Sequence, residues 1–132
     1  MIQSGMPRLD PRVRLRLRLD VTPRWNGARR VQMETIDLSG AGAALLSPVY
    51  LPLKTQVLVS LRLPRLAGEG AVDLEVEAVV VNVEEIGHER EWWRAGVYFL
   101  NLSQPDQHAL RRFVYRALEA PGDRLASPGA QG

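Results

Sequence analysis

The sequence contains no cysteine, and only two of its 132 residues are histidine. Disulfide bonds and thiolate-bound metal sites are therefore excluded, and the lack of cysteine suits the reducing cytoplasm, where we expect the protein to act. Long apolar runs are missing as well, because the longest candidate, residues 79–83, has only the length of a strand, while a bilayer-crossing helix needs roughly 20 apolar residues. The first ten residues also lack the apolar segment of a signal peptide, so we expect neither secretion nor membrane insertion.

Lysine is almost absent too. Sixteen of the 17 basic residues are arginine, and Lys54 is the single lysine. Residues 1–30 carry eight arginines and two aspartates, a net charge of +6, whereas the remaining 102 residues carry a net charge of −4. Positive potential is thus concentrated toward the N-terminus, where it would attract an anionic partner. The planar guanidinium group also forms paired hydrogen bonds with phosphate oxygens and guanine edges, which lysine cannot do.

The length of the chain fits a single domain, and most of its apolar residues alternate with polar ones, as they do in strands. The clearest case runs from Arg12 to Val21, where every second residue is apolar, until Pro23 ends the pattern. The same period of two predicts further strands at residues 31–38, 43–46, 56–63, 72–83 and 92–100. We expect the proline- and glycine-containing segments between them, and the charged residues 84–89, to form loops.

The C-terminal part has helical periodicity instead. Ser103, followed three residues later by Asp106 and with Pro105 in the first turn, is a helix-capping pattern. Apolar residues then recur at helical spacing over about 15 residues: Leu110, Phe113, Val114 and Ala117, with Leu118 close to the same stripe.

Six short strands without helices between them, followed by one helix, indicate a small all-β barrel or sandwich that the helix caps. We divide the chain into a flexible N-terminal segment at residues 1–11, a barrel domain with its helix at residues 12–120, and a disordered tail at residues 121–132.

Two short motifs frame the first two expected strands. Arg8-x-x-x-Arg12 lies directly before the first strand, and Asp37-x-Ser39-x-x-Gly42 lies at the end of the second. Their order, spacing and context resemble the RxxxR and (D/N)xSxxG signatures of the PilZ domain family. The segment at residues 95–99 and the closing helix are similar too, so the resemblance covers residues 8–118. It implies a six-stranded antiparallel PilZ-type β-barrel capped by one α-helix, which binds the bacterial second messenger cyclic di-GMP and is not an enzyme.

The chemistry of that ligand, which carries two phosphates and two guanines, agrees with the residue types in the motifs. The resemblance implies that Arg8 and Arg12 contact guanine edges and phosphates, and that Asp37 accepts hydrogen bonds from the N1–H and N2–H₂ groups of guanine. Ser39 can donate or accept a hydrogen bond at short range. Gly42 is expected to let the backbone turn with a positive φ and to let the ligand approach closely. A site with both arginine and aspartate selects guanine together with phosphate rather than anions in general.

One position departs from the family pattern, since many members have a second arginine directly before RxxxR and this sequence has Pro7. The affinity and the number of bound ligands therefore stay open. The RxxxR pattern also occurs starting at Arg12 and at Arg14, but we reject both alternatives because these arginines lie within the alternating strand. In the simplest interpretation, the arginines of that strand form a face exposed to solvent. The second motif could likewise consist of turn residues only.

The other reactive side chains indicate no catalytic centre. Ser39 lacks the glycine two residues earlier that a nucleophile elbow needs, and we expect both histidines to lie at the surface. The adjacent Trp92 and Trp93 should point one into the core and one outward.

Two further functions remain open. A PilZ-fold adaptor would not bind the nucleotide and would only dock onto a motility or pilus-related partner. A nucleic-acid-binding barrel would use the basic first strand, but that strand lacks the exposed aromatic residues that stack on bases, so we expect no DNA or RNA partner. A single-domain receptor would relay its signal by contact with a separate protein effector, itself being a monomer or a weak homodimer.

Overall fold

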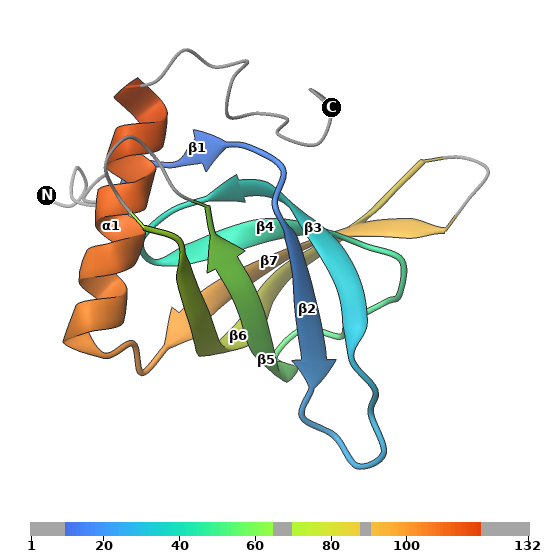
Figure 1. Ribbon diagram of the computed structural model, residues 1–132. Coiled ribbons are helices and arrows are strands. Elements are labelled where there is room, and N and C mark those ends of the chain that lie inside the picture. The colour runs from blue at the N-terminus through green and yellow to red at the C-terminus, as the bar shows by residue number, and fades with distance from the viewer. Residues whose placement is uncertain (1–9, 65–69, 88–90, 120–132) are drawn as a thin grey trace, which may run out of the picture.

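The computed structural model describes residues 10–64, 70–87 and 91–119 of the chain (Figure 1). Its elements are β1 (Val13–Arg14), β2 (Arg18–Pro23), β3 (Val31–Leu38), β4 (Gly42–Ser47), β5 (Gln56–Leu63), β6 (Val72–Ile86), β7 (Trp92–Leu100) and α1 (Gln104–Glu119).

The strands close into an antiparallel barrel. Around the ring the order is β2, β5, β6, β7, β4 and β3, and β3 pairs with β2 to complete the closure. The short β1 pairs with the C-terminal end of β3, and β2 pairs with the N-terminal half of the same strand. Since β1 and β2 lie end to end along β3, they share one place in the ring. The predicted six-stranded antiparallel barrel with one C-terminal helix is confirmed.

The first predicted strand is continuous in burial but divided in hydrogen bonding. Leu15 and Leu17, which lie between β1 and β2, are as buried as the inward-facing residues on either side of them. Across this interruption the register against β3 shifts by one residue, which is the signature of a β-bulge.

Thr35 of β3 satisfies the backbone groups that the interruption leaves unpaired. Its hydroxyl donates a hydrogen bond to the carbonyl oxygen of Leu15 (2.6 Å) and accepts one from the N–H of Leu17 (2.9 Å). The N–H of Thr35 in turn donates to the carbonyl oxygen of Leu17 (2.9 Å). The buried Thr35 side chain therefore fixes the path of residues 15–17, which directly follow the N-terminal motif and β1.

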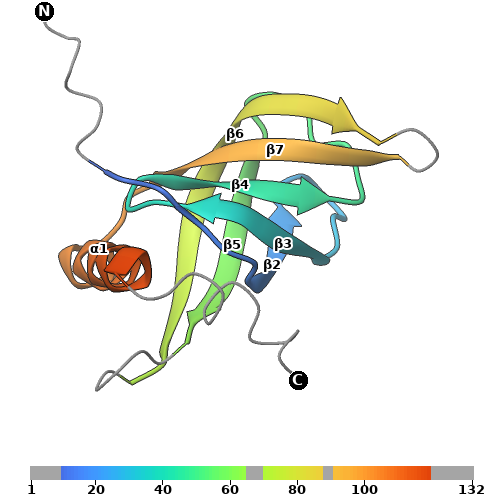
Figure 2. The ribbon, with the colours of Figure 1, turned by 90° about the horizontal axis from the view of Figure 1, so that it is seen from above.

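Helix α1 packs against the barrel and contributes to the same core as the strands (Figure 2). The predicted cap is present, because the Ser103 hydroxyl accepts a hydrogen bond from the N–H of Asp106 (3.2 Å). The buried stripe consists of Leu110, Phe113, Val114 and Ala117. Leu118, which we placed close to that stripe, is 46% exposed and lies outside it. Within the described ranges, no helix has the length and apolar character that a bilayer crossing requires.

The β6–β7 hairpin is longer than predicted. Residues 84–86 were expected in a loop, but they pair with residues 92–94 of β7 and carry the hairpin past the barrel (Figure 1). Trp92 and Trp93 lie on this extension, and both are half-buried. The expectation of one inward and one outward tryptophan was therefore wrong, since the sheet leaves the core here. The Trp93 ring instead packs edge-on against Tyr50, with 6.0 Å between the ring centroids.

Candidate functional site

A bulge in β3 places Asp37 on the outside of the barrel. Against β4, Thr35 pairs with Leu45 and Asp37 pairs with Ala44, so Ile36 is the extra residue. Thr35 and Leu38 on either side are buried, whereas the Asp37 side chain keeps 14% of its surface exposed. The carboxylate is thus largely covered and yet faces away from the core.

Two arginines from distant parts of the chain converge on this carboxylate. Arg12, just before β1, donates from Nη1 to Oδ1 of Asp37 at 2.5 Å. Arg94, from β7, has its Nη2 3.6 Å from Oδ2 of the same group. The structure therefore brings together the second arginine of one motif and the aspartate of the other. Arg8 lies outside the described residues, and its role stays a prediction.

Arg94 was not predicted from the sequence, because it belongs to neither motif. It lies on β7 two residues before Gly96, so both residues are on the outward-facing side of the strand. This side of β7 lies next to β3, because β4 pairs with both strands. Only the closed ring makes those three strands neighbours.

Ser39 shapes the turn between β3 and β4. Its hydroxyl accepts hydrogen bonds from the N–H groups of Ala41 and Gly42 (3.1 Å each), and it lies 3.3 Å from the Gly42 carbonyl oxygen, to which it donates. The Ser39 N–H also donates to that carbonyl oxygen, at 2.9 Å. Because Ser39 is only 2% exposed, its hydroxyl serves this turn, in agreement with the turn-residue interpretation of the second motif.

The glycine of the motif is required for a different reason than we expected. Positive φ angles occur at Gly27 and Gly87 among the described glycines, and Gly42 is not among them. A Cβ at Gly42 would collide with the backbone carbonyl oxygen of Val97 on β7. The expectation of a positive φ was therefore wrong, and the close packing of β4 on β7 demands the glycine.

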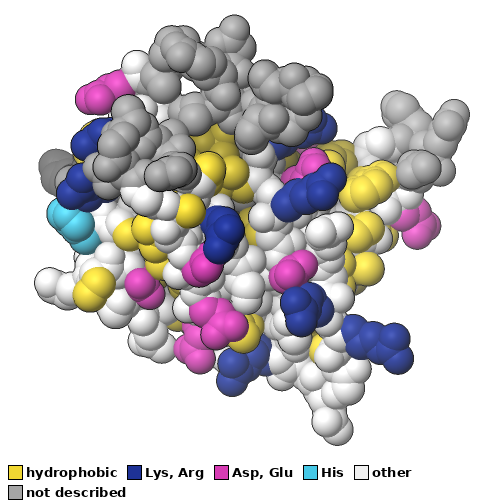
Figure 3. All heavy atoms as spheres, in the orientation of Figure 1, with side chains coloured by type: hydrophobic (Ala, Val, Ile, Leu, Met, Phe, Trp, Pro, Cys, Tyr) yellow, Lys and Arg dark blue, Asp and Glu magenta, His cyan; other side chains and the backbone are white. Residues whose placement is uncertain are grey.

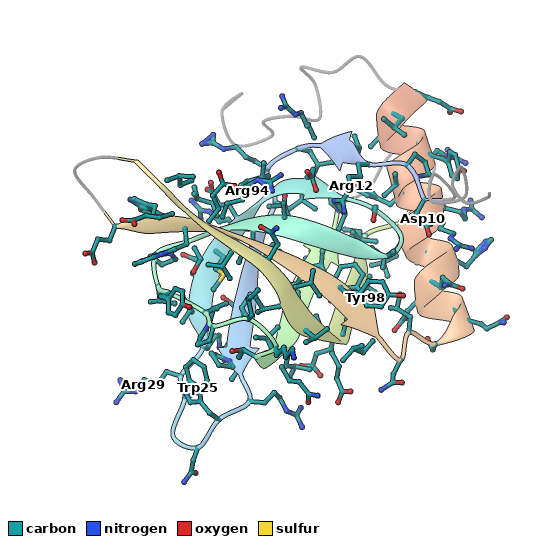
Figure 4. The ribbon with its side chains drawn as sticks, turned by 180° about the vertical axis from the view of Figure 1, so that it is seen from behind. Asp10, Arg12, Trp25, Arg29, Arg94 and Tyr98 are labelled. Atoms are coloured by element: carbon teal, nitrogen blue, oxygen red, sulfur yellow. The ribbon has the colours of Figure 1, made fainter. Side chains whose placement is uncertain are left out.

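The residue between the two motif arginines is anchored to the C-terminal helix. Asp10 accepts hydrogen bonds from Nε and Nη2 of Arg111 at 2.9 and 3.4 Å, and this hydrogen bond and the negative charge of Asp10 raise the pKa of Arg111. A Cβ at Gly40 would lie 2.6 Å from the Asp10 carboxylate and 2.9 Å from Cγ of Arg111. The pair thus rests directly on the turn of the second motif, and Figure 4 shows Asp10 and Arg12 together at one end of the barrel beside α1.

Small residues lie next to Asp37 on the neighbouring strands. Ala44 lies opposite Asp37 on β3 and opposite Gly96 on β7, and Gly42 lies opposite Tyr98. Tyr98 is 53% exposed. Because Ala44 and Gly42 are both buried, these small residues let the strands and side chains beside Asp37 pack closely.

The excess positive charge of the N-terminal region is partly balanced across the strands. Arginine and acidic side chains are interspersed on the face seen in Figure 3. Arg16 pairs with Glu34 at 3.5 Å and Arg30 with Asp20 at 3.3 Å. These two pairs neutralise part of the positive charge of the region.

Comparisons with known proteins agree with the fold. A family model for the PilZ domain matches residues 7–116, and no curated protein sequence matches the chain. The inhibitor of motility MotI/DgrA from Bacillus subtilis superposes with a TM-score of 0.71 at 18% identity, over 84% of this chain and 51% of that one.

Two further solved structures contain the nucleotide. The PilZ domain of YcgR from Escherichia coli with c-di-GMP has a TM-score of 0.61 at 17% identity, over 83% of this chain and 89% of that one. The MrkH–c-di-GMP complex from K. pneumonia has a TM-score of 0.62 at 21% identity, over 84% of this chain and 52% of that one. The chain therefore spans about half the length of the MotI/DgrA and MrkH chains, and at these identities the likeness establishes the fold.

Proposed function

Because the chain belongs to the PilZ domain family, we propose that it is a receptor that binds cyclic di-GMP over Asp37, with Arg12, Arg8 and the turn at residues 39–42 completing the site. The observation that carries the proposal is the 2.5 Å ion pair between Arg12 and Asp37, which are 25 residues apart in sequence. It puts a guanidinium group and a carboxylate at one point on the outer surface of the barrel.

The two groups have complementary roles toward the ligand. Asp37 is an acceptor only, so it fits the N1–H and N2–H₂ donors of guanine. When guanine takes the carboxylate, Arg12 is released and can bond O6 and N7 of the base or a phosphate. The ligand thus replaces an internal ion pair by two charge-assisted contacts, and a ligand lacking either guanine or phosphate could not make both.

We further propose that the domain has no catalytic activity and works in the cytoplasm as a monomer or weak homodimer. Its signal would pass to a separate protein by direct contact.

Isothermal titration of cyclic di-GMP into the purified protein tests the proposal, with GTP and cyclic di-AMP as competitors. We expect saturable binding selective for cyclic di-GMP and a loss of about tenfold or more in affinity for Arg12→Ala and for Asp37→Asn. Arg62→Ala is the matched control, because Arg62 also pairs with a carboxylate, Asp73 at 2.7 Å, but lies on β5 away from the site. Absence of binding by the folded wild-type protein would reject the receptor and favour the adaptor that only docks onto a partner.

A further inference from the structure

The Asp37 carboxylate lies between two cationic side chains. Each carboxylate oxygen has its own guanidinium partner, Oδ1 with Arg12 and Oδ2 with Arg94. Only 14% of the Asp37 side chain is exposed, so little of the carboxylate is open to a ligand while the two arginines lie against it.

The Arg94 side chain is oriented toward Asp37 and not toward its nearest acidic neighbour across the strands. Its direct cross-strand neighbour on β6 is Glu84, the ordinary partner for an arginine at such a position. Among the described residues, however, no ion pair joins Arg94 to Glu84, and the guanidinium group instead points to Asp37, which lies beyond β4. Arg94 and Arg12 consequently lie on the same end of the barrel, as Figure 4 shows.

On the basis of the proposed function, we propose that Arg94 is an additional ligand-binding arginine, which exchanges Asp37 for the nucleotide when guanine binds. The two donors on the guanine edge would each bond one oxygen of Asp37, so guanine competes there with Arg12 at Oδ1 and with Arg94 at Oδ2. The displaced guanidinium group remains charged and adjacent to a dianionic ligand. Its planar donors fit a phosphate or the O6 and N7 atoms of guanine.

In this role, Arg94 would replace the arginine that is missing at position 7, where this chain has Pro7. The family pattern often has an arginine there, and this chain supplies its extra guanidinium group from β7 instead. Because Arg94 is held on a strand of the barrel, recruiting it to the ligand costs little conformational entropy.

A purely structural role for Arg94 makes the opposite prediction. If Arg94 only neutralised Asp37, its removal would free one carboxylate oxygen, and guanine would bind as well as before or more tightly. If Arg94 contacts the ligand, its removal weakens binding. The sign of the change therefore separates the two roles.

The test is isothermal titration of cyclic di-GMP at several NaCl concentrations into the wild-type protein, Arg94→Gln, Arg94→Lys and the equally charged control Arg62→Gln. We expect Arg94→Gln to bind about tenfold or more weakly and with a shallower salt dependence, because one ionic contact is lost. Arg94→Lys should be intermediate, and Arg62→Gln should match the wild type.

Unchanged or tighter binding by Arg94→Gln, with thermal unfolding like that of the wild type, would overturn the role of Arg94 and leave the receptor proposal intact. If Arg94→Gln does not fold, wild-type affinity in Arg94→Lys would overturn it. If the wild-type protein itself binds no cyclic di-GMP, the proposed function fails and this inference fails with it.

Discussion

Asp10 and Arg111 are separated by 101 residues in the sequence, yet their side chains form two hydrogen bonds across the turn of the second motif. Asp10 lies between the two arginines of RxxxR, and Arg111 lies on the exposed side of α1. The pair therefore connects the segment that carries Arg12 with the C-terminal helix. Any movement of residues 10–12 on ligand binding must either carry Arg111 along or break the pair.

Replacing Asp10 by asparagine should loosen the N-terminal segment without unfolding the barrel. An exposed ion pair contributes little to stability, so we expect the melting temperature to change little. The segment would then have to be ordered at the moment of binding, and the affinity for cyclic di-GMP should fall about two- to fivefold. Hydrogen exchange of the amides of residues 12–14 and calorimetric titration measure the two effects.

Asp73→Asn is the control for that experiment, since Asp73 also accepts two hydrogen bonds from one arginine, Arg62, at 2.7 and 3.1 Å. It lies on β6, away from the motif. Equal changes in affinity for Asp10→Asn and Asp73→Asn would mean that the Asp10–Arg111 pair has no specific role in positioning the segment.

The two glycines of the β3–β4 turn should respond very differently to alanine. A Cβ at Gly42 meets the Val97 carbonyl oxygen, a backbone atom that can move only if β4 and β7 separate. Gly42→Ala should therefore destabilise the protein by about 2–4 kcal/mol. A Cβ at Gly40 meets the side chains of Asp10 and Arg111, which can rotate away, so Gly40→Ala should lose less than about 1 kcal/mol.

Urea denaturation compares the two glycine variants. Gly40→Ala should in addition weaken nucleotide binding to the same extent as Asp10→Asn, because both displace the same ion pair. Similar stabilities of Gly40→Ala and Gly42→Ala would contradict the packing argument.

Local periodicity predicts most of the strands correctly. The bounds of β3, β5 and β7 coincide with the expected ranges 31–38, 56–63 and 92–100. Buried residues alternate with more exposed ones throughout β5 and over most of the other two strands. The predicted loop at residues 84–86 was wrong, since those charged residues lie on a hairpin that extends beyond the core and need no apolar face.

The site is harder to predict than the strands, because it depends on which strands become neighbours. The two motifs identified Arg12 and Asp37 from their spacing, and the structure places them in contact. Arg94 and Asp10 acquire their partners only when the ring closes and α1 docks. The one-residue shift between β1 and β2 is likewise invisible in the sequence, since burial continues to alternate across it while the hydrogen bonding changes.

The Thr35 hydroxyl at that shift gives a final prediction. Thr35→Val keeps the shape of the side chain and removes both of its hydrogen bonds, which leaves the N–H of Leu17 and the carbonyl oxygen of Leu15 without their side-chain partner. Since Thr35 is 1% exposed, we expect a loss of about 2–3 kcal/mol in the free energy of unfolding. Thr35→Ser keeps the hydroxyl and loses one methyl group, so it should lose only about 1 kcal/mol.

Urea denaturation of the two variants measures the difference, and a valine variant as stable as the serine variant would show that the hydroxyl does not hold the bulge. The same bulge sets the path of β1, so Thr35→Val should also bind cyclic di-GMP more weakly than Thr35→Ser does.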